Sequence, residues 1–278
     1  MAWVTGAGGL IGSHLVGLAR ECAPAWEVRG LTRRDLDLTD FAAVRGAFER
    51  DRPGLVIHAA ALSRTPACEA EPALARLLNV EVTRVLAEAA ADARLVFLSS
   101  DLVFDGRAGN YDESATPHPL NVYAETKVAA EQIVRSHPRH LVVRTSLNAG
   151  ISPTGDRAFN EALRRSWEMG REVTLFTDEF RNPIPAEVTA RAVWTLVVQG
   201  RTGLFHVAGS ERLSRWEIGR ILAERWRHLS PRLVSGSLRG HGGPARSPDT
   251  TLNCARAQAV LPFPLPRFSQ WVAEGGAV

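Results

Sequence analysis

The sequence predicts an α/β protein in which a doubly wound parallel sheet carries a smaller C-terminal lobe. In the first half, short runs of aliphatic and β-branched residues alternate with longer segments of helical periodicity. A glycine-rich turn follows the first run, and the alternation loosens after Arg144, where turn residues and prolines become frequent. Such alternation is typical of βαβ units, which build parallel sheets with helices on both faces.

The predicted elements follow in order along the chain. We expect strands at residues 2–5, 27–31, 55–58, 95–99 and 141–144, and helices between them at residues 10–20, 73–91 and 122–135. Further on, we expect helices at residues 158–169 and 186–198, and a strand at 203–207 that returns to the main sheet. Residues 1–147, completed by about 183–208, would form the sheet domain, and residues 148–182 and 209–278 would form the lobe.

Composition excludes several classes of protein. The formal net charge is +3 and the basic residues are scattered, so nucleic acid is not an expected partner. No stretch approaches the roughly 20 apolar residues of a membrane helix. The first predicted strand starts at residue 2, which leaves no room for a signal peptide, and we expect a cytoplasmic protein. The three cysteines are widely spaced, so neither a metal site nor a disulfide framework is indicated.

One residue type occurs only once. Of the 33 lysine and arginine residues, Lys127 is the single lysine. A chain that uses arginine at every other basic position has no general need for lysine. We therefore interpret position 127 as one that requires an ammonium group.

Three glycines shape the turn after the first predicted strand. Gly6, Gly9 and Gly12 are spaced as G-x-x-G-x-x-G, and Leu10 and Ile11 between them open the next predicted helix. Glycine permits close approach of the backbone to a pyrophosphate, and the helix N-terminus offers free amides. Glycines also end strands for backbone reasons alone. The strand before the turn and the helix after it favour a Rossmann-like dinucleotide-binding domain.

The end of the second predicted strand bears on the choice of cofactor. An acidic residue at this place usually accepts hydrogen bonds from the ribose hydroxyls of NAD. Arg33 and Arg34 stand there instead, and two guanidinium groups can neutralise the 2′-phosphate of NADPH. We expect NADPH, with NADH as the alternative if the arginines are only solvated charges. Asp37 and Leu38 follow as further cofactor contacts, with Asp37 able to accept from the adenine amino group, before a helix N-cap signal at Asp40.

Tyr123 and Lys127 are candidates for the chemical centre. They lie four residues apart in a predicted helix, so both side chains rise from one face and can meet the same ligand. A phenol has a reference pKa of about 10, and lowering it towards 7 requires roughly 4 kcal/mol of phenolate stabilisation. A nearby ammonium can supply part of that stabilisation. The alternative is an ordinary pair of surface residues on a helix.

Hydroxyl side chains end the fourth predicted strand. Ser99 and Ser100 lie at its carboxyl end, where ligands bind in open α/β sheets. Ser100 can hydrogen-bond a substrate carbonyl, although a serine after a strand is often turn chemistry only. With Tyr123 and Lys127 it would complete a triad for carbonyl chemistry.

These residues together resemble the extended short-chain dehydrogenases, most closely the dTDP-4-dehydrorhamnose reductase group. The resemblance spans nearly the whole chain, and its most specific motif is Ser-Asp-x-Val-Phe-Asp-Gly at residues 100–106. Besides the glycine turn, it rests on residues 58–61, 79–80, 99–106, 111–113, 119–123, 127, 144–146, 182–183 and 203–209.

The resemblance implies a function. NADPH would deliver a hydride to a ketone on a nucleotide-linked deoxysugar, and Tyr123 would donate the proton to the developing alkoxide. Lys127 would tune Tyr123 and bind the nicotinamide ribose, while Ser100 would polarise the carbonyl. The partner would be a small-molecule substrate, with no nucleic acid or membrane involved, and a homodimer is the working expectation for the oligomeric state.

The same resemblance implies further cofactor and substrate contacts. Residues expected along the cofactor, with Asn79 helping to order a proton path, are Ala59, Ala60, Ala61, Asn79 and Ser99. Residues expected at the substrate in the lobe or at its border are Ser63, Ser100, Asp101, Asn148, Arg181 and Arg246. The two arginines are candidates for a substrate diphosphate, with a structural role as the alternative for each.

Departures from the family pattern keep other functions open. Leu102 and residues 146–149 replace aromatic residues of the family, so a different ketosugar or a non-sugar carbonyl is an alternative substrate. Nucleotide-sugar epimerases and dehydratases use the same fold, but Ser100-Asp101-Leu102 lacks the glutamate usual in dehydratases. The regulatory subunit of methionine adenosyltransferase also resembles this group. A non-catalytic NADP-binding subunit should show an eroded triad, whereas this triad is complete.

Overall fold

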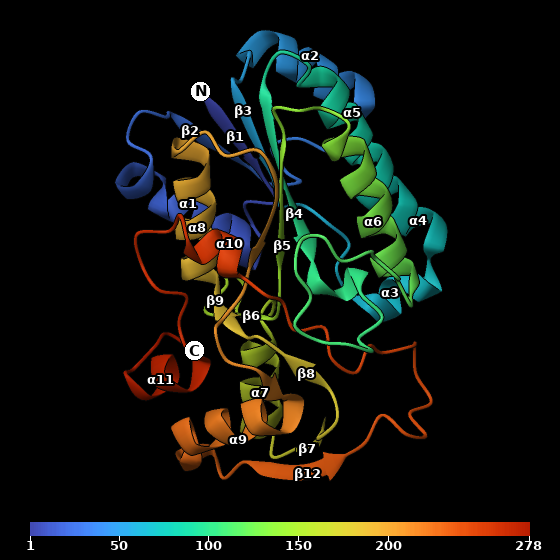
Figure 1. The fold of residues 1–278 in the computed structure, drawn as a ribbon, viewed down its shortest axis with the longest axis vertical. Coiled ribbons are helices and arrows are strands. Elements are labelled where there is room, and N and C mark those ends of the chain that lie inside the picture. The colour runs from blue at the N-terminus through green and yellow to red at the C-terminus, as the bar shows by residue number, and fades with distance from the viewer.

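One six-stranded, wholly parallel sheet organises the computed structural model, which describes residues 1–278 (Figure 1). From edge to edge, its strands are β10 (Gly203–Val207), β5 (Leu141–Thr145), β4 (Arg94–Ser100), β3 (Leu55–His58), β1 (Ala2–Thr5) and β2 (Val28–Leu31). The chain winds outward from β1 in one direction to β2 and in the other through β3 to β10. The predicted doubly wound sheet is thereby confirmed, and β10 does return to it beside β5.

Helices cover both faces of the sheet because its strands are apolar on both sides. On one face, α1 (Leu10–Cys22) and α8 (Ala186–Val198) pack against each other and on the strands. On the other face lie α2 (Phe41–Asp51), α5 (Val82–Ala89) and α6 (Val122–Arg135). Because all six strands are parallel, their carboxyl ends meet at a single edge of the sheet.

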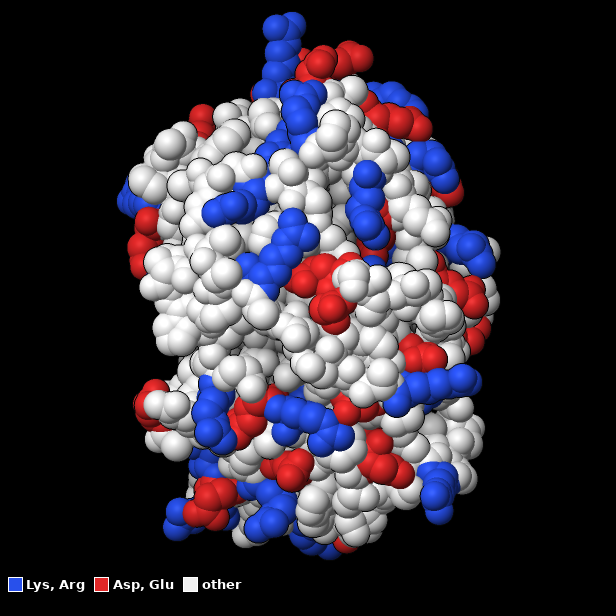
Figure 2. Space-filling view, viewed as in Figure 1, with Lys and Arg blue, Asp and Glu red and all other residues white.

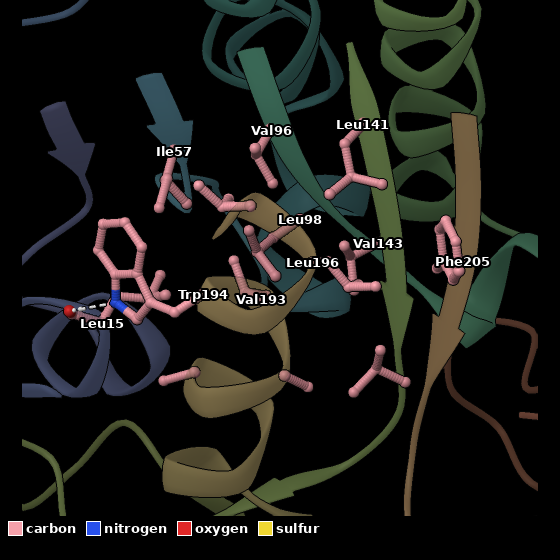
Figure 3. Close-up of a cluster of buried hydrophobic side chains, with 14 of the residues drawn as sticks. Leu15, Ile57, Val96, Leu98, Leu141, Val143, Val193, Trp194, Leu196 and Phe205 are labelled. Atoms are coloured by element: carbon pink, nitrogen blue, oxygen red, sulfur yellow. Dashed lines mark hydrogen bonds between the residues drawn. The ribbon is translucent and has the colours of Figure 1, made fainter. Parts of the chain in front are cut away.

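The larger core lies between the sheet and the pair formed by α1 and α8 (Figure 3). Leu98 and Val143 point from neighbouring strands towards the α8 side chains. Trp194 of α8 is fully buried, and its indole nitrogen donates to the carbonyl oxygen of Leu15 at 2.8 Å. Because an indole buried without a partner would be destabilising, this bond ties α8 to α1.

The single helix expected at residues 73–91 was wrong in detail. After α3 (Thr65–Ala70), the structure has α4 (Pro72–Arg76), a π-helical turn η1 (Leu77–Glu81) and then α5. Asn79 lies in the π turn and hydrogen-bonds both backbone groups of Leu62, which gives a local reason for the irregular turn. For α2 the sequence indicated only its N-cap, and Asp40 does accept a hydrogen bond from the amide of Ala43.

The lobe lies beyond the carboxyl ends of the strands (Figure 1). Its elements, with the short helix η2 that adjoins it, are η2 (Asp101–Val103), β6 (Asn148–Ala149), α7 (Phe159–Glu168), β7 (Glu172–Phe176), β8 (Phe180–Arg181), β9 (Ile184–Pro185), β11 (Leu213–Ser214), α9 (Arg215–Arg225), η3 (Arg227–Leu229), β12 (Arg232–Gly236) and α11 (Phe268–Ala273). Helix α10 (Ala255–Gln258) instead packs on β10 in the main core. Trp167, Trp226 and Phe268 are buried in a core of its own. No helix in the protein is both long and apolar enough to cross a membrane.

Two parts of the lobe were not foreseen from the sequence, which suggested loops and short helices there. Strand β12 pairs in parallel with β7, although neither segment has a strong strand pattern. Helix α9 extends over 11 residues and begins with a capping box, in which Ser214 accepts from the Glu217 amide and Glu217 accepts from the Ser214 amide. That capping box was the available signal for the helix.

Two buried side chains on α6 face the sheet. Glu131 pairs with Arg144 of β5 through two contacts of 2.9 and 2.7 Å, with both side chains almost fully enclosed. One turn earlier, the Lys127 ammonium lies 4.0 Å from the ring centroid of Phe97 on β4, and Lys127 is only 2% exposed. Burial lowers the pKa of Lys127 to about 7, and the nearby Glu131 opposes that shift.

We predict that Lys127→Met stabilises the fold near neutral pH. Between pH 7 and 10.5 the unfolded chain keeps its lysine protonated while the folded protein does not, so wild-type stability rises with pH across this window. The variant removes that dependence. Its melting temperature should exceed that of the wild type by roughly 3–10 °C at pH 7, and the difference should shrink towards pH 10.

Thermal melts without added cofactor at several pH values would measure this difference. Arg135→Met is the matched control, because Arg135 lies on the same helix and is exposed. It should change stability by no more than about 0.5 kcal/mol at any pH. A Lys127→Met protein that melts below the wild type at pH 7 would contradict the prediction.

Candidate active site

The glycine turn after β1 forms one wall of the site. Gly6 has a φ of +71°, and a Cβ there would lie 2.6 Å from the amide nitrogen of Ala60. At Gly12 a Cβ would lie 2.1 Å from the carbonyl oxygen of Gly6, so α1 packs directly on the turn. Glycine is required at both places, and the backbone of the turn stays uncovered for a ligand.

Helix α1 begins at this turn with an N-terminus that has no side-chain cap. Its N-cap is Gly9, which supplies no side-chain cap, and its first turn carries no acidic residue. Leu10 and Ile11 pack their side chains against Ala158 and Ala186, which leaves their amides as the groups available to a ligand. Free amides and the positive end of the helix dipole fit the pyrophosphate of a dinucleotide.

Both candidate arginines after β2 are exposed. The nearest acidic partner of Arg33 is Asp37, 3.6 Å away, and the Arg33 side chain is 84% exposed. Asp37 accepts from the amide and hydroxyl of Thr39, and Leu38 packs in the core beneath α2. The sequence interpretation left out Asp35, whose carboxylate is held by the amide and hydroxyl of Thr32 at 2.8 and 2.6 Å.

The segment after β3 is held in place by Asn79. The Asn79 side chain accepts from the Leu62 amide at 2.8 Å and donates to the Leu62 carbonyl at 3.1 Å and to the Thr126 hydroxyl at 2.9 Å. These bonds join the segment that contains Ala59, Ala60 and Ala61 to α6. Asn79 therefore fixes the segment after β3 against α6. Ser63, the residue after Leu62, is exposed.

Tyr123 lies in the first turn of α6, where two side chains fix the helix end. The Asn121 side chain accepts from the Ala124 amide at 3.0 Å, and Glu69 accepts from the Val122 amide at 2.8 Å. Burial raises the pKa of Tyr123 above its ordinary value, Ser100 opposes that shift by hydrogen bonding, and the Asp101 carboxylate adds to it. The protein's own groups thus keep the phenol protonated near Ser100. This is opposite to the lowered pKa expected from the sequence, because burial outweighs any stabilisation by Lys127, whose own pKa is lowered to about 7.

His58 completes the surroundings of Lys127 and was noted in the sequence only as part of a motif. Its Nδ1 lies 2.7 Å from the Thr5 hydroxyl, and burial together with the Lys127 charge lowers the pKa of His58 to about 3. The imidazole is therefore neutral. Its Nε2 and the Ser99 hydroxyl are buried without a protein partner at the ends of β3 and β4.

Asp101 links the end of β4 to the lobe. One carboxylate oxygen accepts from the hydroxyls of Ser146 at 2.7 Å and Thr250 at 2.9 Å, and the other lies 3.1 Å from the Ser100 hydroxyl. Arg181 lies 3.7 Å away. The Asp101 carboxylate, expected at the substrate, is therefore engaged by protein groups.

The remaining substrate candidates differ in how many of their polar groups are already bound by protein groups and in how exposed their side chains are. Asn148 uses its whole amide, donating to the Thr145 hydroxyl and the Ser146 carbonyl and accepting from Thr189. Arg181 is 5% exposed and is held by Glu179 and the Ser247 carbonyl. Arg246 also pairs with Glu179, but its side chain is 38% exposed.

The site as a whole combines an uncapped helix N-terminus with a buried, protonated phenol. The glycine turn, the segment after β3 and the end of β4 lie along the carboxyl edge of the parallel sheet, and Tyr123 and Lys127 come from α6. A protonated phenol beside a serine hydroxyl can give a proton to an oxygen atom held between them. An ammonium one turn away can stabilise the phenolate left behind.

Comparison with known proteins agrees with this geometry. The profile of the RmlD substrate binding domain family matches residues 1–275. A dTDP-4-keto-6-deoxy-D-glucose reductase of Streptomyces niveus is 34% identical over 223 residues, which cover 78% of this chain and 76% of that protein. The methionine adenosyltransferase 2 subunit beta of Xenopus laevis is 29% identical over 93% of this chain and 82% of that protein.

A solved structure extends the likeness to the fold. The dTDP-4-dehydrorhamnose reductase of Bacillus anthracis, determined in complex with NADP, has a TM-score of 0.89 to this chain at 24% identity and covers 98% of this chain and 97% of its own. Sheet, helices and lobe thus all have counterparts in a known protein. Over almost its entire length, this chain belongs to the RmlD substrate binding domain family.

Proposed function

We propose that this protein is an NADPH-dependent reductase that acts on a ketone of a nucleotide-linked deoxysugar. The proposal is supported by the hydrogen bond between Ser100 and Tyr123 and by Lys127, which lies one turn further along α6 and beside His58 at the end of β3. The relative from Streptomyces niveus, a reductase by name, supports the reaction class. In this proposal residues 1–147 and 183–208 bind the cofactor, and residues 148–182 and 209–278 bind the substrate.

Each residue of the triad has a physical role in this reaction. NADPH, when bound, would supply the hydride. The amides at Gly9 and the start of α1 would hold its pyrophosphate, while Ser100 would hold the substrate carbonyl. Tyr123 would give its proton to the carbonyl oxygen as negative charge develops there. Since its pKa is raised by the protein, Tyr123 enters as the protonated acid that reduction needs.

Lys127 would act on the phenolate that proton donation leaves behind. With its pKa near 7, Lys127 is readily protonated once a negative charge forms one turn away. Its compact ammonium can serve both the phenolate oxygen and ribose hydroxyls. His58, neutral and close by, adds no competing charge.

Two alternatives fit the structure less well. A dehydratase needs a second free acid or base beside the substrate, and Asp101, the nearest carboxylate, is engaged by Ser146 and Thr250. A non-catalytic NADP-binding subunit, as the relative from Xenopus laevis would suggest, could use Lys127 for the ribose but has no need of Ser100 beside Tyr123. The triad is complete here, which favours catalysis.

We predict that Tyr123→Phe lowers turnover by roughly two to four orders of magnitude, because the general acid is lost. NADPH oxidation would be followed with a panel of nucleotide-linked ketosugars, and NADPH affinity should hardly change. Tyr111→Phe is the matched control, since Tyr111 is the only other tyrosine and its hydroxyl bonds Asp105 instead. Turnover of Tyr123→Phe close to that of the wild type would rule out the proton-donor role.

We also predict a preference for NADPH over NADH, because Arg33 and Arg34 are exposed at the end of β2. Dissociation constants for both cofactors would be measured on the wild type, Arg33→Ala and Arg34→Ala. Removing an arginine that contacts the 2′-phosphate should weaken NADPH binding roughly 10-fold or more and leave NADH binding unchanged. Arg20→Ala, at an exposed position of α1, is the control. Equal affinities of the wild type for the two cofactors would refute the preference.

A further inference from the structure

A cluster of charged side chains lies where the lobe meets the end of β4. Glu179 is its centre and pairs with Arg181 at 2.9 Å and with Arg246 at 2.8 Å. Asp101 lies 3.7 Å from Arg181 and is also satisfied by two hydroxyl groups. Both carboxylates of the cluster are therefore already neutralised by protein groups.

Arg215 is the third arginine of the cluster and lacks a partner. Its backbone amide donates to the Glu179 carbonyl at 2.8 Å, which places the first residue of α9 against the cluster. The guanidinium makes no ion pair and no hydrogen bond with the protein, and its Cζ lies 5.3 Å from the ring centroid of Phe159. Burial lowers the pKa of Arg215 to about 10, so the group remains charged at neutral pH.

The cluster thus carries three guanidinium groups and two carboxylates, with the excess positive charge on Arg215. Positive and negative side chains are interspersed over the face shown in Figure 2. A partly buried guanidinium without an acceptor is costly. Its planar fork matches the oxygens of a phosphate group.

The position of Arg215 indicates which kind of anion this side chain would bind. The Arg215 amide donates to Glu179, and Glu179 also pairs with Arg181. Arg181 lies 3.7 Å from Asp101, which directly follows Ser100. Arg215 therefore lies at the same junction of lobe and sheet as the proposed carbonyl site. Arg181, a candidate from the sequence, is enclosed by its protein partners, whereas Arg246 keeps an exposed part.

We propose that Arg215 binds the diphosphate of a nucleoside diphosphate-linked substrate, with the exposed part of Arg246 beside it. The inference rests on the proposed function, since it names how that substrate is held. Glu179 then acts as a positioning residue, because it orients Arg246 and, through its backbone, the start of α9.

The test is a calorimetric titration of thymidine diphosphate into protein saturated with NADPH, with inorganic pyrophosphate as a second probe. Arg215→Gln should weaken binding of both probes roughly 10- to 100-fold, the usual range for loss of a charged hydrogen-bonding partner. Arg215→Lys should retain part of the affinity, since it keeps the charge without the fork. NADPH affinity should be unchanged in both, which separates the substrate diphosphate from the cofactor phosphates.

Arg220→Gln is the matched control, because Arg220 is an exposed arginine of the same helix. It should bind both probes as the wild type does. Folded Arg215→Gln or Arg215→Lys protein that binds thymidine diphosphate within twofold of the wild type would overturn the proposal, as would a wild type that binds neither probe. The readout is binding, so failure to reduce any ketosugar would count against the proposed function and leave this result standing.

Discussion

A buried lysine that makes no direct ion pair constrains the whole site. The ammonium of Lys127 rests on the ring of Phe97 and lies beside a neutral His58. Such a charge is unfavourable unless the surrounding structure holds it in place. Glu131 and Arg144 supply that restraint by pinning the next turn of α6 to β5. Because α6 cannot slide without breaking this buried pair, Tyr123 is fixed beside the end of β4.

The lobe is joined to the sheet through the residue next to the reacting groups. Asp101 follows Ser100 and accepts hydrogen bonds from Ser146, after β5, and from Thr250, far along the chain. A shift of the lobe relative to the sheet would therefore move Asp101 and, with it, the neighbouring Ser100. We infer that substrate held by the lobe and the carbonyl held by Ser100 are positioned by one network of hydrogen bonds.

Much of the sheet domain could be predicted from the sequence. Its strands are short apolar runs buried on both faces, so their limits differ from the predicted ones by only one or two residues. The glycine turn was recognisable from its spacing between a predicted strand and a predicted helix. The structure gives the reason for the glycines, because Gly6 and Gly12 meet backbone atoms that exclude any side chain. Lys127 was recognisable because it is the only lysine. Its burial shows that it is not an ordinary surface residue.

The lobe and the partners of the charged residues could not be predicted in the same way. Asp101 and Thr250 are 149 residues apart, and no local pattern records such a contact. Arg181 and Arg215 look alike in the sequence, yet only the fold shows that Glu179 holds the first and leaves the second free. Strands of two residues, such as β8 and β11, are set by pairing across the lobe and not by their own propensity.

The central claim is that position 127 requires a compact ammonium and not merely a positive charge. Steady-state turnover of Lys127→Arg, on protein whose melting temperature and NADPH binding are checked in the same preparation, tests it most directly. A planar guanidinium cannot serve the Tyr123 hydroxyl and the ribose hydroxyls together in this enclosed place. We expect folded Lys127→Arg protein to lose about 100-fold or more of the wild-type turnover. Turnover near that of the wild type would mean that charge alone suffices and would contradict the account.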